Sequence, residues 1–95
     1  MKINDEEVQL KITPLALRKI EESDPEFDFL KLLREAQDGT REPKITDYYK
    51  IIYSGFIGAK PESSITFDDF LKLIEDIDLI EINHVGIKLL IERKN

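Results

Sequence analysis

Few residues in this sequence could do chemistry, and His84 is the clearest candidate for a catalytic group. The chain contains one histidine and no cysteine. A serine nucleophile needs a neighbouring base, so a Ser-His pair would have to use His84. His84 lies between Asn83 and Val85 in an apolar segment, where a capping, surface or core role is favoured over catalysis. No glycine-rich phosphate loop occurs. We therefore predict a protein that is not an enzyme and has neither catalytic residues nor a cofactor.

Acidic residues of the second half of the chain pose the question of a metal site. The cluster comprises Asp68, Asp69, Glu75, Asp76, Asp78 and Glu81. Read from Asp76, a calcium-binding EF-hand loop would need glycine at its sixth position and glutamate at its twelfth. The chain has Glu81 and Ile87 at these positions, so the motif fails. Asp68 and Asp69 instead suit the positive end of a helix dipole. We expect no metal site.

An aromatic stripe in the middle of the chain is the candidate for binding a partner protein. From Ile45 to Ile57, apolar side chains recur at the i, i+3, i+4 and i+7 spacing of an amphipathic helix. The partner-binding candidates within it are Tyr49, Tyr53, Phe56 and Ile57. Tyrosine combines an apolar ring with a polar tip, which suits a partly wet interface. The alternative interpretation is that the whole stripe belongs to the core.

The elements that must position these residues begin with an extended N-terminus. Val8, Leu10 and Ile12 alternate with polar residues, which predicts a half-buried β-strand over 8–12. Ile3 can open a partner strand, with residues 4–7 as the turn. A lone hairpin is only marginally stable, so it must pack on helices or meet a partner chain.

Two helices are predicted next from their end signals. Thr13-Pro14 is an N-cap followed by proline at the first helical position, and this helix ends near Ser23. Asp24-Pro25 repeats the same signal and predicts the start of a second helix, which Gly39 ends. A polar loop over 37–44 then leads to the helix of the aromatic stripe.

Thr46 is the predicted N-cap of the stripe helix, and Gly55 and Gly58 are expected to weaken its end. Thr66 caps a fourth helix.

The last helix is predicted from about Leu79, after a break at residues 76–78. Gly86 lies inside it, and close helix packing would explain a glycine there. The alternative is a β-strand, because Val85, Ile87, Leu89 and Ile91 alternate with their neighbours as strand residues do. These elements predict a mainly α fold, a small helical domain with a short N-terminal β-strand or hairpin, and one domain over 1–95.

Composition restricts the classes of partner. The chain has 95 residues, a 41% hydrophobic and 36% charged composition, and a net charge of −6. This negative charge disfavours binding to nucleic acid and to anionic membrane surfaces. The acidic start lacks the apolar stretch of a signal peptide, and no apolar run approaches a membrane span. We therefore expect a cytoplasmic protein that binds neither nucleic acid nor membrane.

Three segments together resemble the tail assembly chaperones of long-tailed bacteriophages. They are residues 10–21, a strand leading into a short helix; residues 48–56, an amphipathic helix ending at a glycine; and residues 65–75, a capped acidic helix. The order of these segments and the length of the chain carry the resemblance.

The resemblance implies a protein that binds the tape measure protein and keeps it soluble while tail tube subunits assemble around it. It also implies the cytoplasm of a bacterial host as the location, and it supplies no catalytic residues. The sequence is also compatible with a homo-oligomer. The alternative function is an acidic inhibitor that mimics the charge of nucleic acid and blocks a DNA-binding protein.

Overall fold

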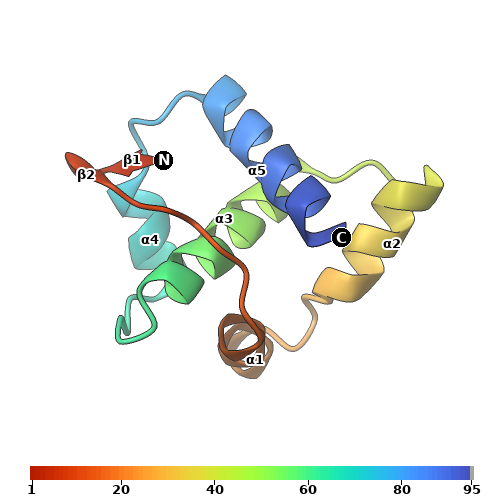
Figure 1. Ribbon diagram of the computed structural model, residues 1–95, viewed down its shortest axis with the longest axis horizontal. Helices are drawn as coiled ribbons and strands as arrows, with labels where there is room; N and C mark the ends of the chain where they lie inside the picture. Colours follow the sequence, from red (N-terminus) through yellow and green to blue (C-terminus); the bar gives the residue numbers. More distant parts are fainter. Residues whose placement is uncertain (95) are drawn as a thin grey trace.

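The computed structural model describes residues 1–94 and consists mainly of helices (Figure 1). An antiparallel hairpin opens the chain, with Lys2 opposite Glu7 and Ile3 opposite Glu6. The elements are β1 (Lys2–Ile3), β2 (Glu6–Glu7), α1 (Pro14–Ser23), α2 (Phe29–Asp38), α3 (Ile45–Ala59), α4 (Phe67–Leu73) and α5 (Leu79–Lys94). The predicted fold class, mainly α with a short N-terminal β element, is confirmed.

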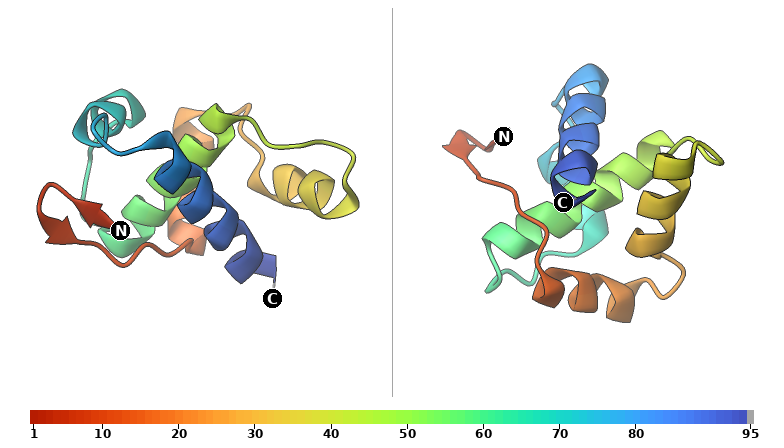
Figure 2. Two further views of the ribbon diagram at one scale, coloured as in Figure 1. Left: turned by 90° about the horizontal axis from the view of Figure 1, so that it is seen from above. Right: turned by 45° about the vertical axis from the view of Figure 1, so that its right-hand side comes forward.

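Helix α3 is the centre of the fold because it is the most apolar of the helices. An unbroken run from Ile51 to Gly58 is buried, and α1, α4 and α5 all pack against α3. The two further views show these helices on different sides of α3, with α5 crossing it (Figure 2). A helix that is apolar nearly all round needs neighbours all round, and this requirement fixes the arrangement of the other helices.

Most predicted helix ends are confirmed. The hydroxyl oxygens of Thr13 and Thr66 accept hydrogen bonds from the backbone three residues later, both at 3.1 Å. Gly39 ends α2 in the left-handed conformation, with φ of 71°. The start of the second helix at Asp24-Pro25 is wrong. The Asp24 amide donates to the Ile20 carbonyl at 2.7 Å and so closes α1, while Asp28 caps α2 instead.

The predicted strand over 8–12 is also wrong. The hairpin lies earlier in the chain, and its turn residues Asn4 and Asp5 adopt the positive φ values that tight hairpin turns favour. Val8 extends the hairpin, because its amide donates to the Met1 carbonyl at 2.8 Å, whereas residues 9–12 are extended but pair with no strand. Instead they cross α3, where the Lys11 amide donates to the Gly55 carbonyl at 3.1 Å. We call residues 8–12 the strap; Figure 1 shows it passing over α3.

Glycines in α3 and α5 mark the places where chain segments approach closely. A Cβ atom at Gly58 would overlap the Lys11 carbonyl of the strap, and one at Gly55 would lie 3.1 Å from Leu10 Cβ. Helix α3 continues to Ala59, so these glycines admit the strap and do not end the helix. A Cβ atom at Gly86 would overlap the Tyr48 side chain, which confirms the close helix packing predicted there.

The last part of the chain is helical, so the strand alternative is excluded. Helix α5 begins at Leu79 after the predicted break, and it packs across α3. Ile82, Leu89 and Leu90 are buried, whereas Ile91 is exposed.

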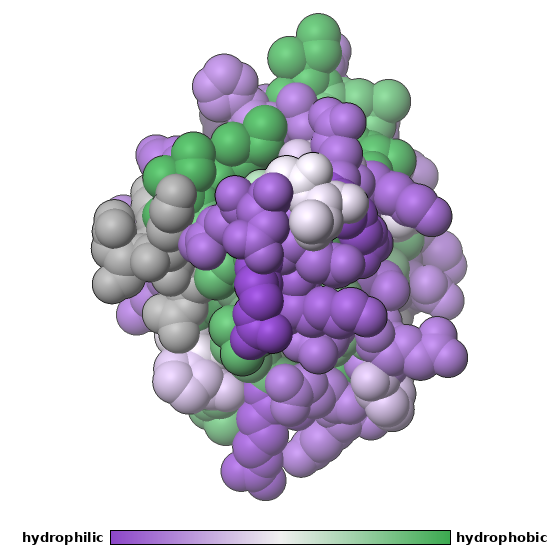
Figure 3. Space-filling model, turned by 90° about the vertical axis from the view of Figure 1, so that its right-hand side faces the viewer, coloured by the Kyte–Doolittle hydropathy of each residue, from purple (hydrophilic) through white to green (hydrophobic). Residues whose placement is uncertain are grey.

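Several large apolar side chains remain exposed outside the core. Figure 3 shows the face that carries α2, where hydrophobic groups gather toward the upper end and the upper left and hydrophilic groups fill the middle. In Figure 1 the upper end is where α5 begins. The exposed apolar residues at that start are Leu79 and Ile80.

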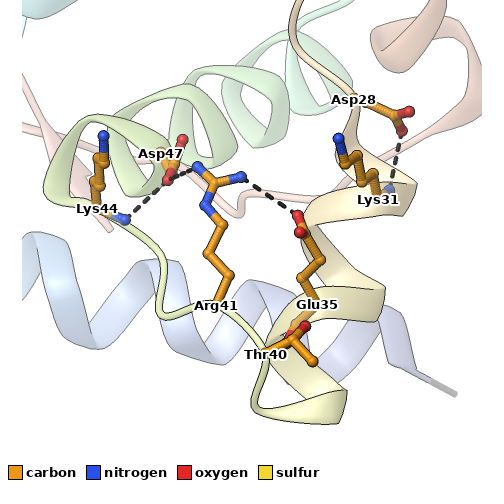
Figure 4. A network of polar contacts seen from close by, with 7 residues as sticks. All are labelled: Asp28, Lys31, Glu35, Thr40, Arg41, Lys44 and Asp47. Atoms are coloured by element: carbon orange, nitrogen blue, oxygen red, sulfur yellow. Dashed lines mark hydrogen bonds and ion pairs between the residues drawn. The ribbon is translucent and has the colours of Figure 1, made fainter.

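A polar network joins the end of α2 to the start of α3 (Figure 4). Arg41 donates to Glu35 at 3.4 Å and to Asp47 at 2.9 Å. The Asp47 carboxylate also accepts the Lys44 amide hydrogen bond at 2.8 Å, so α3 begins at Ile45 with Lys44 as its N-cap residue. The prediction of Thr46 as N-cap is therefore wrong. The helix begins earlier, at Ile45, because the Asp47 carboxylate binds the backbone amide of Lys44.

Candidate functional site

The predicted partner-binding residues lie mostly inside the protein. Tyr53, Phe56 and Ile57 are buried, and Tyr49 is half-buried. The rings of Tyr53 and Phe56 pack against Phe70 of α4, with centroid distances of 5.4 and 5.1 Å. Burial agrees with the core interpretation of the stripe. Direct contact of these residues with a partner stays a prediction.

Two of the four residues also form part of the wall of a pocket. The pocket lies where α1 and α3 meet the start of α4, and it has a volume of about 490 Å³. Tyr53 and Ile57 contribute from α3, Ile20 from α1 and Phe67 from α4. Tyr49 and Phe56 do not line it. The stripe therefore supplies an apolar surface that is reachable through an opening, although most of each side chain is buried.

The rim of this pocket is polar and already well ordered. The Lys50 ammonium lies 2.9 Å from the Asp24 carboxylate and 5.5 Å from the centre of the Phe27 ring. The Lys19 ammonium donates to the Pro61 carbonyl on the opposite side. Two ammonium groups beside an apolar wall can receive an apolar side chain and the polar backbone that flanks it.

Tyr53 holds the pocket wall in place through its hydroxyl group, which donates to the Ile65 carbonyl at 2.6 Å. Burial raises the pKa of Tyr53 above its ordinary value. The pKa of Tyr48 is also raised, by burial first and then by the negative charges of Glu42 and Asp47. Both shifts favour the neutral phenol, the form in which the Tyr53 hydroxyl donates its hydrogen bond.

The raised pKa of Tyr53 predicts that the protein loses stability at alkaline pH. The pKa of tyrosine in the unfolded chain is about 10, and its pKa in the folded protein is higher. The resulting contribution to the free energy of unfolding is fully present below the unfolded-state pKa and is lost as pH rises through the folded-state pKa. Urea unfolding measured at increasing pH should therefore show a falling free energy of unfolding above about pH 10. Tyr53→Phe should reduce that fall, although it costs about 1 kcal/mol at neutral pH through the lost hydrogen bond. If the stability of Tyr53→Phe depends on pH as that of the unchanged protein does, Tyr53 is not the cause of the alkaline loss.

Other chemical groups do not gather at this pocket. His84 is exposed on α5 and lines a different, shallow depression. Of the acidic cluster, only Asp68 lines the pocket. Among residues 1–91, whose side chains the structure describes, no group of three or more His, Asp or Glu side chains is placed to hold a metal ion.

The rim residues could not have been found from the sequence. Lys19 and Pro61 are 42 positions apart, and no local pattern links them. The exposed pair Leu79 and Ile80 had a visible signal, because two consecutive apolar residues follow directly after the acidic break, but Leu79 was interpreted only as the start of a helix.

Comparison of the chain with protein-family models, with curated proteins and with solved structures finds no match. The resemblance to tail assembly chaperones accordingly stays a prediction. None of the helices in the described part of the chain combines the length and apolar character that crossing a membrane requires.

Proposed function

We propose that this chain is a protein-binding assembly factor of the tail assembly chaperone kind, and not an enzyme. The observation that carries the proposal is the pocket beside α1, whose wall contains Tyr53 and Ile57 of the aromatic stripe. An apolar side chain of the partner would enter this pocket, and the lysines on its rim would contact the partner backbone. The proposed partner is the tape measure protein, with the tail tube subunits replacing the chaperone during assembly in the host cytoplasm.

The net charge of −6 supports this role in a second way. A long apolar partner aggregates when it is free, and a strongly charged protein bound along it keeps the complex dispersed. This effect needs no catalytic group.

Blocking the pocket tests the proposal. Ser64 is exposed and lines the pocket. Ser64→Trp should fill the opening and lower the recovery of the partner about tenfold, which corresponds to about 1.4 kcal/mol of binding free energy. The measurement is co-expression with the tape measure protein, which this proposal expects a neighbouring gene to encode, followed by quantification of its soluble, co-purifying fraction.

Ser64→Ala is the matched control and should bind as the unchanged protein does. Alanine variants of Tyr53 or Phe56 are unsuitable, because both side chains belong to the core. Equal partner recovery with Ser64→Trp and Ser64→Ala would refute the pocket as the binding site.

The alternative, a charge mimic that inhibits a DNA-binding protein, is favoured by the same negative charge. Salt separates the two functions, because exposed charge pairs are screened by salt and apolar contacts are not. Binding of a chaperone partner through the apolar pocket should change little between about 50 and about 300 mM salt, whereas any contribution from exposed charge pairs should fall. Recovery of a basic DNA-binding protein that is lost over this range would replace the chaperone proposal.

A further inference from the structure

The corner between α4 and α5 exposes apolar and acidic side chains side by side. Ile80 is 77% exposed and Leu79 is 59% exposed, although both are large apolar residues. We call this region the corner surface and define it by Leu73, Glu75, Asp76, Asp78, Leu79, Ile80 and Glu81. In Figure 3 hydrophobic groups gather at the end of the molecule where α5 begins.

The corner surface is held in one conformation by its backbone. The Asp78 carboxylate accepts a hydrogen bond from the Ile80 amide at 2.7 Å, and the Asp78 carbonyl accepts one from the Ile82 amide at 3.0 Å. Ile74 before the corner and Ile82 after it are both fully buried. Leu79 and Ile80 are therefore displayed on an anchored helix start, where burying either side chain against a partner would be favourable.

Charge at the corner has a single sign. Residues 73–87 include four carboxylates and neither lysine nor arginine. Within the described chain, none of these four carboxylates forms an ion pair with a basic side chain. A shallow depression of about 430 Å³ lies on the first turns of α5, with Ile80 and Val85 beside Asp78, Glu81 and His84. Apolar contact is thus available next to unpaired negative charge.

We propose that the corner surface docks a basic amphipathic helix of a partner protein. Such a helix presents apolar residues at i, i+3 and i+4 to Leu79 and Ile80, and its flanking Lys or Arg side chains pair with Asp78 and Glu81. A second copy of this chain fits less well, because two identical acidic corners would repel each other. The inference rests on the proposed protein-binding function and adds a contact outside the pocket at α1.

A synthetic helical peptide tests this docking without the natural partner. The probe is a peptide of about 18 residues in which leucine forms one face and lysine the other, and binding is followed by fluorescence anisotropy. Ile80→Ser should weaken binding about tenfold, and Glu81→Lys should weaken it about fivefold. Amide chemical shifts should change mainly over residues 75–85.

Matched variants separate docking from general attraction to an acidic protein. Leu30→Ser removes an apolar side chain that is 62% exposed on α2, and Glu21→Lys changes the net charge as Glu81→Lys does. Both should bind within about twofold of the unchanged protein. A peptide with glutamate in place of lysine should not bind.

Three results would overturn the inference: equal weakening by the corner variants and their controls, binding of the acidic peptide, or chemical shift changes centred on α2. Conversion of a dimer to a monomer by Ile80→Ser would also overturn it, because a second copy would then cover the corner. Failure of peptide docking with intact partner recovery in the Ser64 experiment would reject the corner alone. Loss of partner recovery in Ser64→Trp with intact peptide docking would support both sites.

Discussion

Phe70→Ala should lower the free energy of unfolding by about 3–5 kcal/mol. Phe70 is fully buried, and its ring packs against both Tyr53 and Phe56 of α3. A domain of this size has a total stability of about 5–14 kcal/mol, so the variant would lose a large share of it. Urea denaturation followed by circular dichroism measures the change.

Two neighbouring substitutions give the scale of this effect. Phe70→Leu keeps most of the side-chain volume and should cost less than about 1.5 kcal/mol. Leu73→Ala removes an exposed side chain from the same helix and should change stability by less than about 1 kcal/mol. A cost for Phe70→Ala as small as that of Leu73→Ala would show that α4 does not pack on α3 as described.

Gly58→Ala should destabilise the protein by about 2–3 kcal/mol, although alanine is the better helix former. In an open helix the change would gain about 1 kcal/mol. At this position the added Cβ overlaps the Lys11 carbonyl, which is backbone and cannot rotate away. The strap must therefore move off α3 and lose the hydrogen bond from the Lys11 amide to the Gly55 carbonyl. The midpoint of urea unfolding reports the loss.

Gly55→Ala is the matched control, since it lies in the same helix and gains the same helix propensity. Its added Cβ would meet Leu10 Cβ at 3.1 Å and Leu89 Cδ1 at 3.3 Å, so the strap and the Leu89 side chain need to shift by only a few tenths of an ångström. We expect Gly58→Ala to be at least about 2 kcal/mol less stable than Gly55→Ala. Stabilisation by Gly58→Ala would mean that the strap does not lie on α3.

Local signals in the sequence predicted most of the helices correctly. Thr13 and Thr66 were recognised as caps because each accepts a hydrogen bond from an amide only three residues away. The strap was wrongly predicted as a strand because alternation records which side chains are buried and not what buries them. Val8 is buried and Leu10 half-buried as the alternation predicts, but Leu10 lies beside α3 and α5 and not in a sheet.

The candidate site was predictable to a smaller extent. The aromatic stripe identified Tyr53 and Ile57, which line the pocket, since helical spacing places them on one face. Its other wall comes from α1 and from the start of α4, and their approach to α3 depends on contacts between distant parts of the chain. The exposure of Ile80 likewise depends on where α5 crosses α3, and no local sequence pattern predicts that position.

The strap has a consequence for how this chain matures on the ribosome. Leu10 and Leu89 both lie beside Gly55 of α3, although 79 positions separate them in the sequence. The contact between the strap and α5 can therefore form only after α5 has left the ribosome, long after the strap has been synthesised. Closing so long a loop has an entropic cost, so we expect this contact to form late in folding.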